Sequence, residues 1–151
     1  MGSTSDWEPT MKHCAALLEQ LGVPHEAKVI SAHRHPKQLH EFIEGLDESG
    51  IEVIIAGAGG AAHLPGVVAA LTYRPVIGVP CKGWALEGAD SLYSIAQMPG
   101  GVPVACMSIG KAGAKNAALY AASMLGLKYP DIRSAYHKFR DDQSASTPDL
   151  P

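Results

Sequence analysis

The sequence contains few cysteines, and their number and spacing exclude several classes of protein. Only three occur in 151 residues, namely Cys14, Cys81 and Cys106. An odd number of widely spaced cysteines, outside any paired motif, indicates neither a disulfide framework nor a zinc site. We therefore expect a protein of the reducing cytoplasm.

A long apolar segment is also missing. The most apolar stretch, residues 53–71, is interrupted by glycines, by His63 and by Pro65, so it does not resemble a membrane helix. The first residues do not show the basic, apolar and small-residue succession of a secretory leader. These two observations predict a soluble protein without membrane association.

Charge is scarce as well, at 18% of the residues with a net charge of −3. Binding to a nucleic-acid backbone needs a basic excess or a stripe of Lys and Arg, and neither is visible. Glycine and alanine are abundant instead, which favours close backbone packing and large buried interfaces between subunits. We expect a homo-oligomer that does not bind nucleic acid.

What the sequence does contain is a regular alternation of strand and helix patterns over the length of one domain. Apolar residues at helical spacing predict helices at 7–21, 36–46, 65–71, 90–97, 112–125 and 130–140. Short apolar runs predict strands at 27–30, 51–56, 75–79 and 102–109. This indicates a single α/β domain over residues 1–140, built on a parallel sheet, and a polar, disordered tail at 141–151.

The beginning of this alternation is irregular. The segment from Gly2 to Asp6 has the composition of a turn between a strand and a helix, yet only Met1 precedes it. In an open sheet of order 2-1-3-4-5, the first strand is central and separates strands 2 and 3. We therefore expect a sheet that lacks its first strand, so that strands 2 and 3 have no shared neighbour.

Three segments at the expected carboxyl ends of strands carry candidate chemistry. The first, from Gly2 to Asp6, offers backbone N–H groups and the hydroxyls of Ser3 and its neighbours, which can hold a phosphate ahead of a helix. The alternative is that Ser5 or Asp6 only caps the helix that begins near residue 7.

The second segment reads SAHRHP from Ser31 to Pro36. Here His33 supplies an imidazole, the side-chain type suited to acid–base chemistry at neutral pH, and Arg34 presents a fork of donors to a phosphate, which suits proton transfer on a phosphorylated substrate. Both side chains could equally be ordinary solvated loop residues. Metal binding by His33, His35 and His63 is a third option, although no carboxylate or cysteine completes a ligand set.

The third segment, from Gly57 to Gly66, is so rich in glycine and alanine that the backbone must approach something closely. A flat substrate ring would fit, whereas tight packing of a helix on the sheet would explain the small residues but not His63. The spacing is a poor match to a dinucleotide-binding fingerprint. If the three segments follow adjacent strands, a single pocket can use all of them.

Two features stay undecided by the residues alone. The stretch from Asp90 to Pro99 mixes apolar positions with polar ones that could reach a ligand or another subunit. Cys14 and Cys106 fall at positions expected to be in the core, whereas Cys81 falls in an expected loop.

Four motifs together resemble class I PurE, the N5-carboxyaminoimidazole ribonucleotide mutases. The motifs are GSTSDW at residues 2–7, SAHRHP at 31–36, AGAGGAAHLPG at 56–66 and DSLYSIAQMPGGVPV at 90–104. The resemblance implies a flavodoxin-like, three-layer α/β/α fold and a homo-octamer. It also implies isomerisation of N5-carboxyaminoimidazole ribonucleotide to 4-carboxy-5-aminoimidazole ribonucleotide in purine biosynthesis, with no cofactor and no metal.

The resemblance also assigns roles to residues. His33 matches the catalytic histidine, which removes the C4 proton after trapped carbon dioxide has moved from nitrogen to carbon. Arg34 and Ser3 look like phosphate contacts and Asp6 like a ribose contact. The full set of implied substrate-binding residues is Ser3, Asp6, Ser31, Arg34, Gly57, Gly59, Gly60, His63 and Leu64. One departure is His35, which stands where the family usually has threonine.

Two other functions are weighed against this one. The class II relatives carboxylate aminoimidazole ribonucleotide directly with carbon dioxide, but they usually carry SAHK, whereas Arg34 follows His33 here. A non-enzymatic flavodoxin-like module, such as a receiver or a flavin carrier, is the second alternative, and a receiver would need an acidic cluster after the first strand and a phospho-acceptor aspartate after the third. The third expected strand ends in AGAGG instead.

Overall fold

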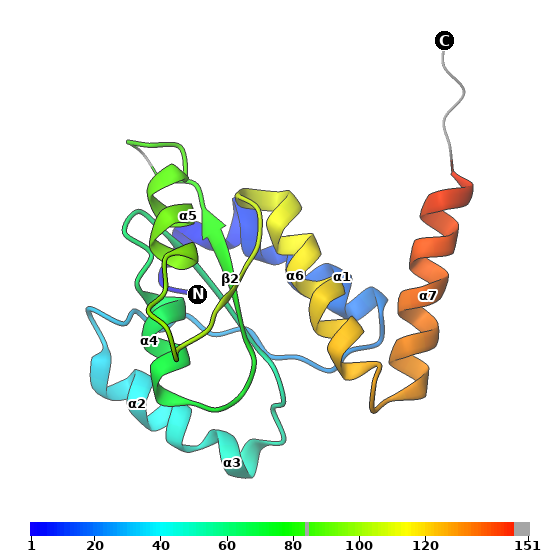
Figure 1. Ribbon diagram of the computed structural model, residues 1–151, viewed down its shortest axis with the longest axis horizontal. Coiled ribbons are helices and arrows are strands. Elements are labelled where there is room, and N and C mark those ends of the chain that lie inside the picture. The colour runs from blue at the N-terminus through cyan, green and yellow to red at the C-terminus, as the bar shows by residue number, and fades with distance from the viewer. Residues whose placement is uncertain (84, 147–151) are drawn as a thin grey trace.

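The computed structural model describes residues 1–83 and 85–146 and shows a parallel sheet between two layers of helices (Figure 1). The strands are β1 (Ile54–Gly59), β2 (Val76–Cys81) and β3 (Ala105–Cys106), in the order β1-β2-β3. Ile54 pairs with Val76, and Ile77 pairs with Ala105. The expected α/β class with a parallel sheet is confirmed.

Seven α-helices and two short helical turns surround the sheet in the described part of the chain. The elements are η1 (Thr4–Asp6), η2 (Trp7–Met11), α1 (Lys12–Gln20), α2 (Pro36–Glu44), α3 (Leu46–Ser49), α4 (Leu64–Leu71), α5 (Ala89–Ala96), α6 (Gly110–Leu125) and α7 (Pro130–Ala145). Helices α1 and α6 lie on one side of β2, and α2, α4 and α5 lie on the other (Figure 1). In the described residues, no helix is both long and apolar enough to cross a membrane.

Two apolar clusters hold these layers together, one on each face of the sheet. The first joins α1 and the alanine-rich face of α6 to Ile77 and Val79 of β2. The second joins Leu39 of α2 and Val68 of α4 to the small residues of β1. Every residue of β2 is buried, as expected for a parallel strand covered on both faces.

Removing a side chain from this core has a predictable cost. Ile77 is completely buried between the layers, and we expect Ile77→Ala to lower the free energy of unfolding by about 2–5 kcal/mol, because the helices cannot close over the cavity. The measurement is urea-induced unfolding followed by circular dichroism. Leu127→Ala is the control, since that side chain is 87% exposed and should change stability by less than about 0.5 kcal/mol.

Several expected elements differ in extent. The helix expected from residue 7 begins as a π-helical turn, and regular α-helix starts only at Lys12. The helix expected at 36–46 is divided at Gly45 into α2 and α3. Helix α7 continues to Ala145, so residues 141–145 are helical rather than part of a disordered tail. Residues 147–151 of that expected tail lie outside the described part of the chain.

Two of the four expected strands are shorter than predicted or absent. Residues 27–30 form no strand, and their backbone bonds to Met1, whose N–H donates to Lys28 O at 2.8 Å and whose O accepts from Ile30 N–H at 2.9 Å. A strand forms when its backbone pairs with a neighbouring strand along its length. Residues 27–30 pair with a single residue, Met1, so they stay extended without forming a strand. The strand expected at 102–109 is reduced to β3, since Val102 N–H turns back to Pro99 O and Pro103 has no N–H.

Candidate active site

Backbone and side-chain hydrogen bonds join the three expected segments at the carboxyl end of β1. Gly2 N–H donates to Gly57 O at 3.1 Å, and the Arg34 guanidinium donates from Nη2 to Gly2 O at 3.1 Å. The rings of His33 and His63 approach with 3.0 Å between Nε2 and Nδ1. The expected convergence of the three segments is therefore present in the fold.

His33 and His63 form a pair of facing imidazole rings in this cluster. Their ring centroids are 5.0 Å apart and their planes lie at 85° to each other, so one ring nitrogen can donate to the other within the plane of its own ring. Both side chains are exposed. Because imidazole titrates near neutrality, the pair can hold, give up and accept a proton at the sheet edge.

The segment from Gly2 to Asp6 also contains a buried carboxylate, because Asp6 is only 7% exposed. Burial raises the pKa of Asp6, while the Met1 ammonium, the Ser3 N–H and the Arg34 guanidinium act in the opposite direction. A buried acidic side chain next to positive charge is typical of a ligand site rather than of a core.

This burial predicts a pH-dependent stability effect. The folded protein holds the Asp6 proton more tightly than the unfolded chain, so ionisation of Asp6 favours unfolding. We expect Asp6→Asn to raise the free energy of unfolding at pH 7, where the carboxylate is charged. This gain should vanish as the pH falls below the ordinary aspartate pKa of about 3.9, where both states are protonated. Urea unfolding at several pH values measures it, with the exposed Asp141→Asn as control.

The glycines of the third segment have different neighbours. A side chain on Gly57 would place its Cβ 2.4 Å from Met11 Sδ, so the Met11 side chain packs directly on this glycine and would have to move to admit a larger residue. A Cβ on Gly59 would contact Lys82 O at 3.5 Å and Asp6 Oδ1 at 3.6 Å, and Gly60 has a φ of +65°. Gly59 and Gly60 therefore lie at the site, and Gly57 lies beneath it.

Ser3 and Ser31, which the sequence predicts as substrate-binding residues, also make hydrogen bonds within their own segments. Ser3 caps η1, because its Oγ accepts from Ser5 N–H at 3.3 Å, whereas Asp6 occupies the N-cap position of η2 without a side-chain capping bond. Ser31 is buried, and its Oγ accepts from Arg34 N–H at 3.3 Å. That bond holds the Arg34 backbone in the loop after the extended segment 27–30.

Leu64 differs from the other expected binding residues because its side chain belongs to the core. It is 6% exposed and packs in the cluster under α4. Only its backbone, at the first turn of α4, is near the loop of His63. Among the described residues, no group of three or more His, Cys, Asp or Glu side chains is arranged to hold a metal ion.

The loop after β2 also reaches this cluster, which the sequence reasoning did not include. A Cβ on Gly83 would lie 3.2 Å from Gly60 N, and Ser91 Oγ donates to Cys81 O at 2.6 Å. The stretch from Asp90 left undecided above thus anchors the end of β2. The sequence did contain one indication that this loop belongs to the site, because the loop follows the next parallel strand and the carboxyl ends of parallel strands meet at one edge of the sheet.

Cys81 is the last residue of β2 and 1% exposed, so its expected place in a loop was wrong. Burial raises the pKa of Cys81 to about 12, and burial does the same for Cys14. Since the thiolate is the reactive form, we expect iodoacetamide at pH 8 to modify these two thiols about 100-fold more slowly in the folded protein than in urea. Cys106, which is only half-buried, is the internal comparison, and peptide mass mapping reads all three sites.

Comparison with known proteins gives consistent matches over the whole described fold. A family model described as AIR carboxylase matches residues 1–146. The chain is 56% identical over 151 residues to N5-carboxyaminoimidazole ribonucleotide mutase of Pseudomonas aeruginosa, covering 100% of the chain and 92% of that protein. It is 61% identical over 142 residues to the mutase of the same name from Pyrococcus abyssi, covering 94% of the chain and 80% of that protein.

A solved structure shows the same fold. The crystal structure of Treponema denticola PurE superposes with a TM-score of 0.84 and 25% sequence identity, covering 96% of this chain and 89% of that one. The three parallel strands and their two helical layers are therefore a flavodoxin-like arrangement shared with a known protein.

Proposed function

The chain belongs to the AIR carboxylase family, and from this premise we propose that it converts N5-carboxyaminoimidazole ribonucleotide to 4-carboxy-5-aminoimidazole ribonucleotide. The enzyme is then an isomerase of purine biosynthesis that transfers a carboxylate within one substrate. The observation that carries the proposal is the His33–His63 pair, 3.0 Å apart, beside the Arg34 guanidinium.

The proposed reaction requires one proton to be given and one to be taken. When the N–carboxylate bond breaks, carbon dioxide leaves and the ring amine needs a proton. When C4 then attacks carbon dioxide, a C–C bond forms and the hydrogen at C4 must be removed to restore the aromatic ring. A single group that first donates and then accepts balances both steps. His33 is placed to be this group, with His63 as its hydrogen-bond partner.

The remaining residues supply binding and orientation. Arg34 offers a planar set of donors that matches a phosphate, and Ser3 adds a hydroxyl at the start of η1. Asp6 can accept hydrogen bonds from ribose hydroxyls. Gly59 and Gly60 leave room for a flat ring against the backbone of the β1 loop. These roles extend the family resemblance to the positions that match it.

Supplying each substrate separately tests the reaction against its nearest rival. We expect product absorbance to rise with N5-carboxyaminoimidazole ribonucleotide alone. Turnover only with aminoimidazole ribonucleotide plus bicarbonate would overturn the proposal in favour of direct carboxylation. A yellow protein, or one that accepts phosphoryl groups, would instead indicate a flavin carrier or a receiver.

We also infer a homo-octamer in the cytoplasm, with a single folded domain that extends through α7 to Ala145 as its unit. The support is the low charge, the abundance of glycine and alanine, and the membership in this family. Light scattering after size exclusion should give eight times the monomer mass. A monomer at micromolar concentration would contradict this assembly.

A further inference from the structure

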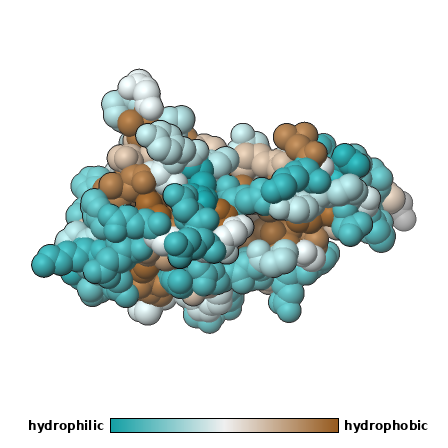
Figure 2. Space-filling view, turned by 90° about the horizontal axis from the view of Figure 1, so that it is seen from below, coloured by the Kyte–Doolittle hydropathy of each residue, from teal (hydrophilic) through white to brown (hydrophobic). Residues whose placement is uncertain are grey.

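A serine hydroxyl is completely buried in the first turn of α5. Apolar side chains reach the surface of the molecule between hydrophilic ones (Figure 2), and scattered exposure of that kind needs no explanation. A buried hydroxyl does need one, because it gives up its hydrogen bonds to water and is costly to bury unless the protein replaces them. Ser91 is 0% exposed, so its hydrogen-bond partners show what keeps it there.

The Ser91 hydroxyl lies between the two ends of the loop that joins β2 to α5. Its Oγ is 2.6 Å from Cys81 O, at the end of β2, and 3.2 Å from Gly88 O, just before α5. A hydroxyl has one proton to donate, and the shorter distance assigns that proton to Cys81 O. Gly88 O already accepts from Leu92 N–H at 2.9 Å, as a bond of the helix itself. What Ser91 adds beyond its own helix is therefore the bond to the end of β2.

The end of β2 lies directly against the glycines of the candidate site. A Cβ on Gly59 would be 3.4 Å from Cys81 O. Just beyond, in the same loop, a Cβ on Gly83 would be 3.2 Å from Gly60 N. Backbones packed this closely move together. A displacement of Cys81 O thus changes the position of Gly59 and Gly60, where the flat ring of the substrate is proposed to lie.

A second serine on the same helix provides a natural comparison. Ser94 Oγ donates to Asp90 O at 2.7 Å, four residues back, which is the ordinary bond of a serine within a helix. That bond stays inside α5 and holds no part of β2. The two hydroxyls therefore differ in what they hold, since Ser94 bonds to its own helix and Ser91 bonds to the neighbouring strand.

We propose that Ser91 is a positioning residue of the isomerase, whose hydroxyl holds the end of β2 so that Gly59 and Gly60 keep the ring of the substrate in place. This inference rests on the proposed function. Ser91 is buried beneath the loop, so it acts through the backbone of Cys81 and the two glycines rather than on a substrate atom. Phosphate binding depends on other segments and should be unaffected.

The reaction gives this positioning a measurable signature. After the N–carboxylate bond breaks, the free carbon dioxide must stay beside C4 until the C–C bond forms. If the ring surface loosens, carbon dioxide escapes, the ring amine takes a proton, and aminoimidazole ribonucleotide is released in place of the carboxylated product. The partition between these two products therefore measures how well the ring is held, whereas a loss of folded protein lowers both together.

Ser91→Ala removes the hydroxyl with little change in shape. We expect kcat for isomerisation to fall about 10-fold while KM changes less than about 3-fold. The share of turnover released as aminoimidazole ribonucleotide should rise about 10-fold, after subtraction of the spontaneous decay of the substrate. Ser91→Thr keeps a hydroxyl and should return the partition toward that of the parent. Ser94→Ala should leave kcat and the partition unchanged.

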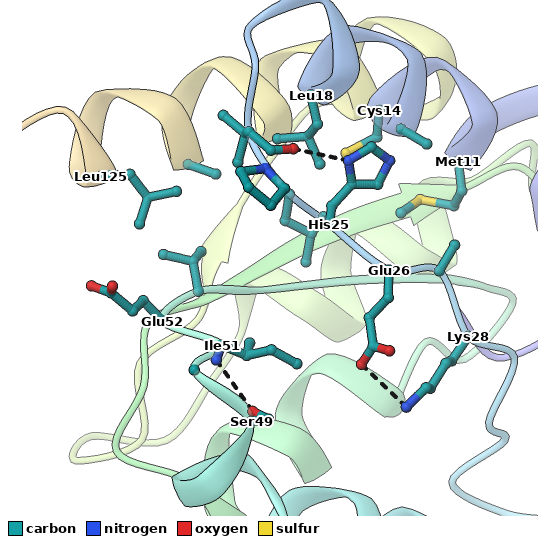
Figure 3. A pocket seen from close by; sticks show the side chains of 18 of the residues that line it. Met11, Cys14, Leu18, His25, Glu26, Lys28, Ser49, Ile51, Glu52 and Leu125 are labelled. Atoms are coloured by element: carbon teal, nitrogen blue, oxygen red, sulfur yellow. Dashed lines mark hydrogen bonds and ion pairs between the residues drawn. The ribbon is translucent and has the colours of Figure 1, made fainter. Parts of the chain in front are cut away.

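The thiol of Cys81 reports on the end of β2 without any substrate. It is 1% exposed, so it reacts when this strand end opens locally. Cys14, which lines a groove of about 720 Å³ between α1 and β1 (Figure 3), is the internal reference. We expect iodoacetamide to modify Cys81 about 10-fold faster in Ser91→Ala than in the parent or in Ser94→Ala, with the rate at Cys14 unchanged.

The outcomes separate this proposal from the function on which it rests. A parent protein that does not isomerise the substrate would overturn the proposed function itself. In an active parent, an unchanged product partition in Ser91→Ala, or equal acceleration of labelling at Cys81 and Cys14, would overturn the role of Ser91 alone. If Ser91→Ala does not fold, Ser91→Cys replaces it in both measurements, because a thiol fills similar space but is a weak donor.

Discussion

His33→Asn should lower kcat by about 10²–10⁴-fold, the usual contribution of a positioned acid or base, while substrate binding changes little. Asparagine keeps a polar group near His63 but cannot exchange a proton near neutrality. The measurement is steady-state kinetics with N5-carboxyaminoimidazole ribonucleotide, with product affinity measured by isothermal titration. The reaction needs one proton delivered and one removed, so losing the group proposed to do both affects both steps.

His35→Thr is the matched control, because His35 lies two residues away in the same loop and is exposed. It makes no side-chain hydrogen bond at the start of α2, and threonine is usual at this position in the family. We expect near-normal kcat in this variant. A near-normal rate in His33→Asn, with the protein folded, would remove His33 from the mechanism.

Arg34→Met should raise KM by about 10–100-fold, because a charge-assisted hydrogen bond to an ionised group contributes about 1.5–3 kcal/mol. Methionine retains much of the length and apolar stem of the side chain but none of its donors. The loss also breaks the bond from Nη2 to Gly2 O, so the loop from Gly2 to Asp6 should become more mobile. Steady-state kinetics and amide exchange of residues 2–6 measure the two effects.

Arg34→Lys separates charge from geometry. Lysine keeps the positive charge but lacks the planar fork, so KM should fall between the values of the parent and the methionine variant. Arg140→Met on the exposed face of α7 is the control for removing a positive charge far from the site, and its KM should not change. If Arg34→Met binds substrate normally, the phosphate contact lies elsewhere.

Much of the fold follows from local patterns in the sequence. The apolar spacing of residues 112–125 and the first-turn proline at Pro130 predict α6 and α7 because these signals act within a few turns. The β-branched run at 51–56 and the run at 75–79 similarly predict β1 and β2, each within three residues of its bounds. Sequence reasoning was weakest where a strand depends on its neighbour, as at 27–30.

The candidate site also has features that the sequence predicts and features that it does not. The sequence predicts that His33 and Arg34 follow a strand end and that His63 follows a glycine loop. It does not show that Leu64 turns into the core or that Met11 packs directly on Gly57. The loop containing Gly83 was missed because nothing in its own composition marks it as part of the site. Each of these facts depends on a residue distant in the chain.

The sequence by itself determined the chemistry of this protein, since residue types, helix signals and motif order are local properties that a chain carries before it folds. It determined a parallel α/β domain, a histidine and an arginine at one edge, and the family. The tertiary structure alone decided that His33 meets His63 at 3.0 Å, that Asp6 is buried, and that Met1 bridges residues 28–30. These are contacts between segments far apart in the chain, and packing of the complete fold selects them rather than local preference.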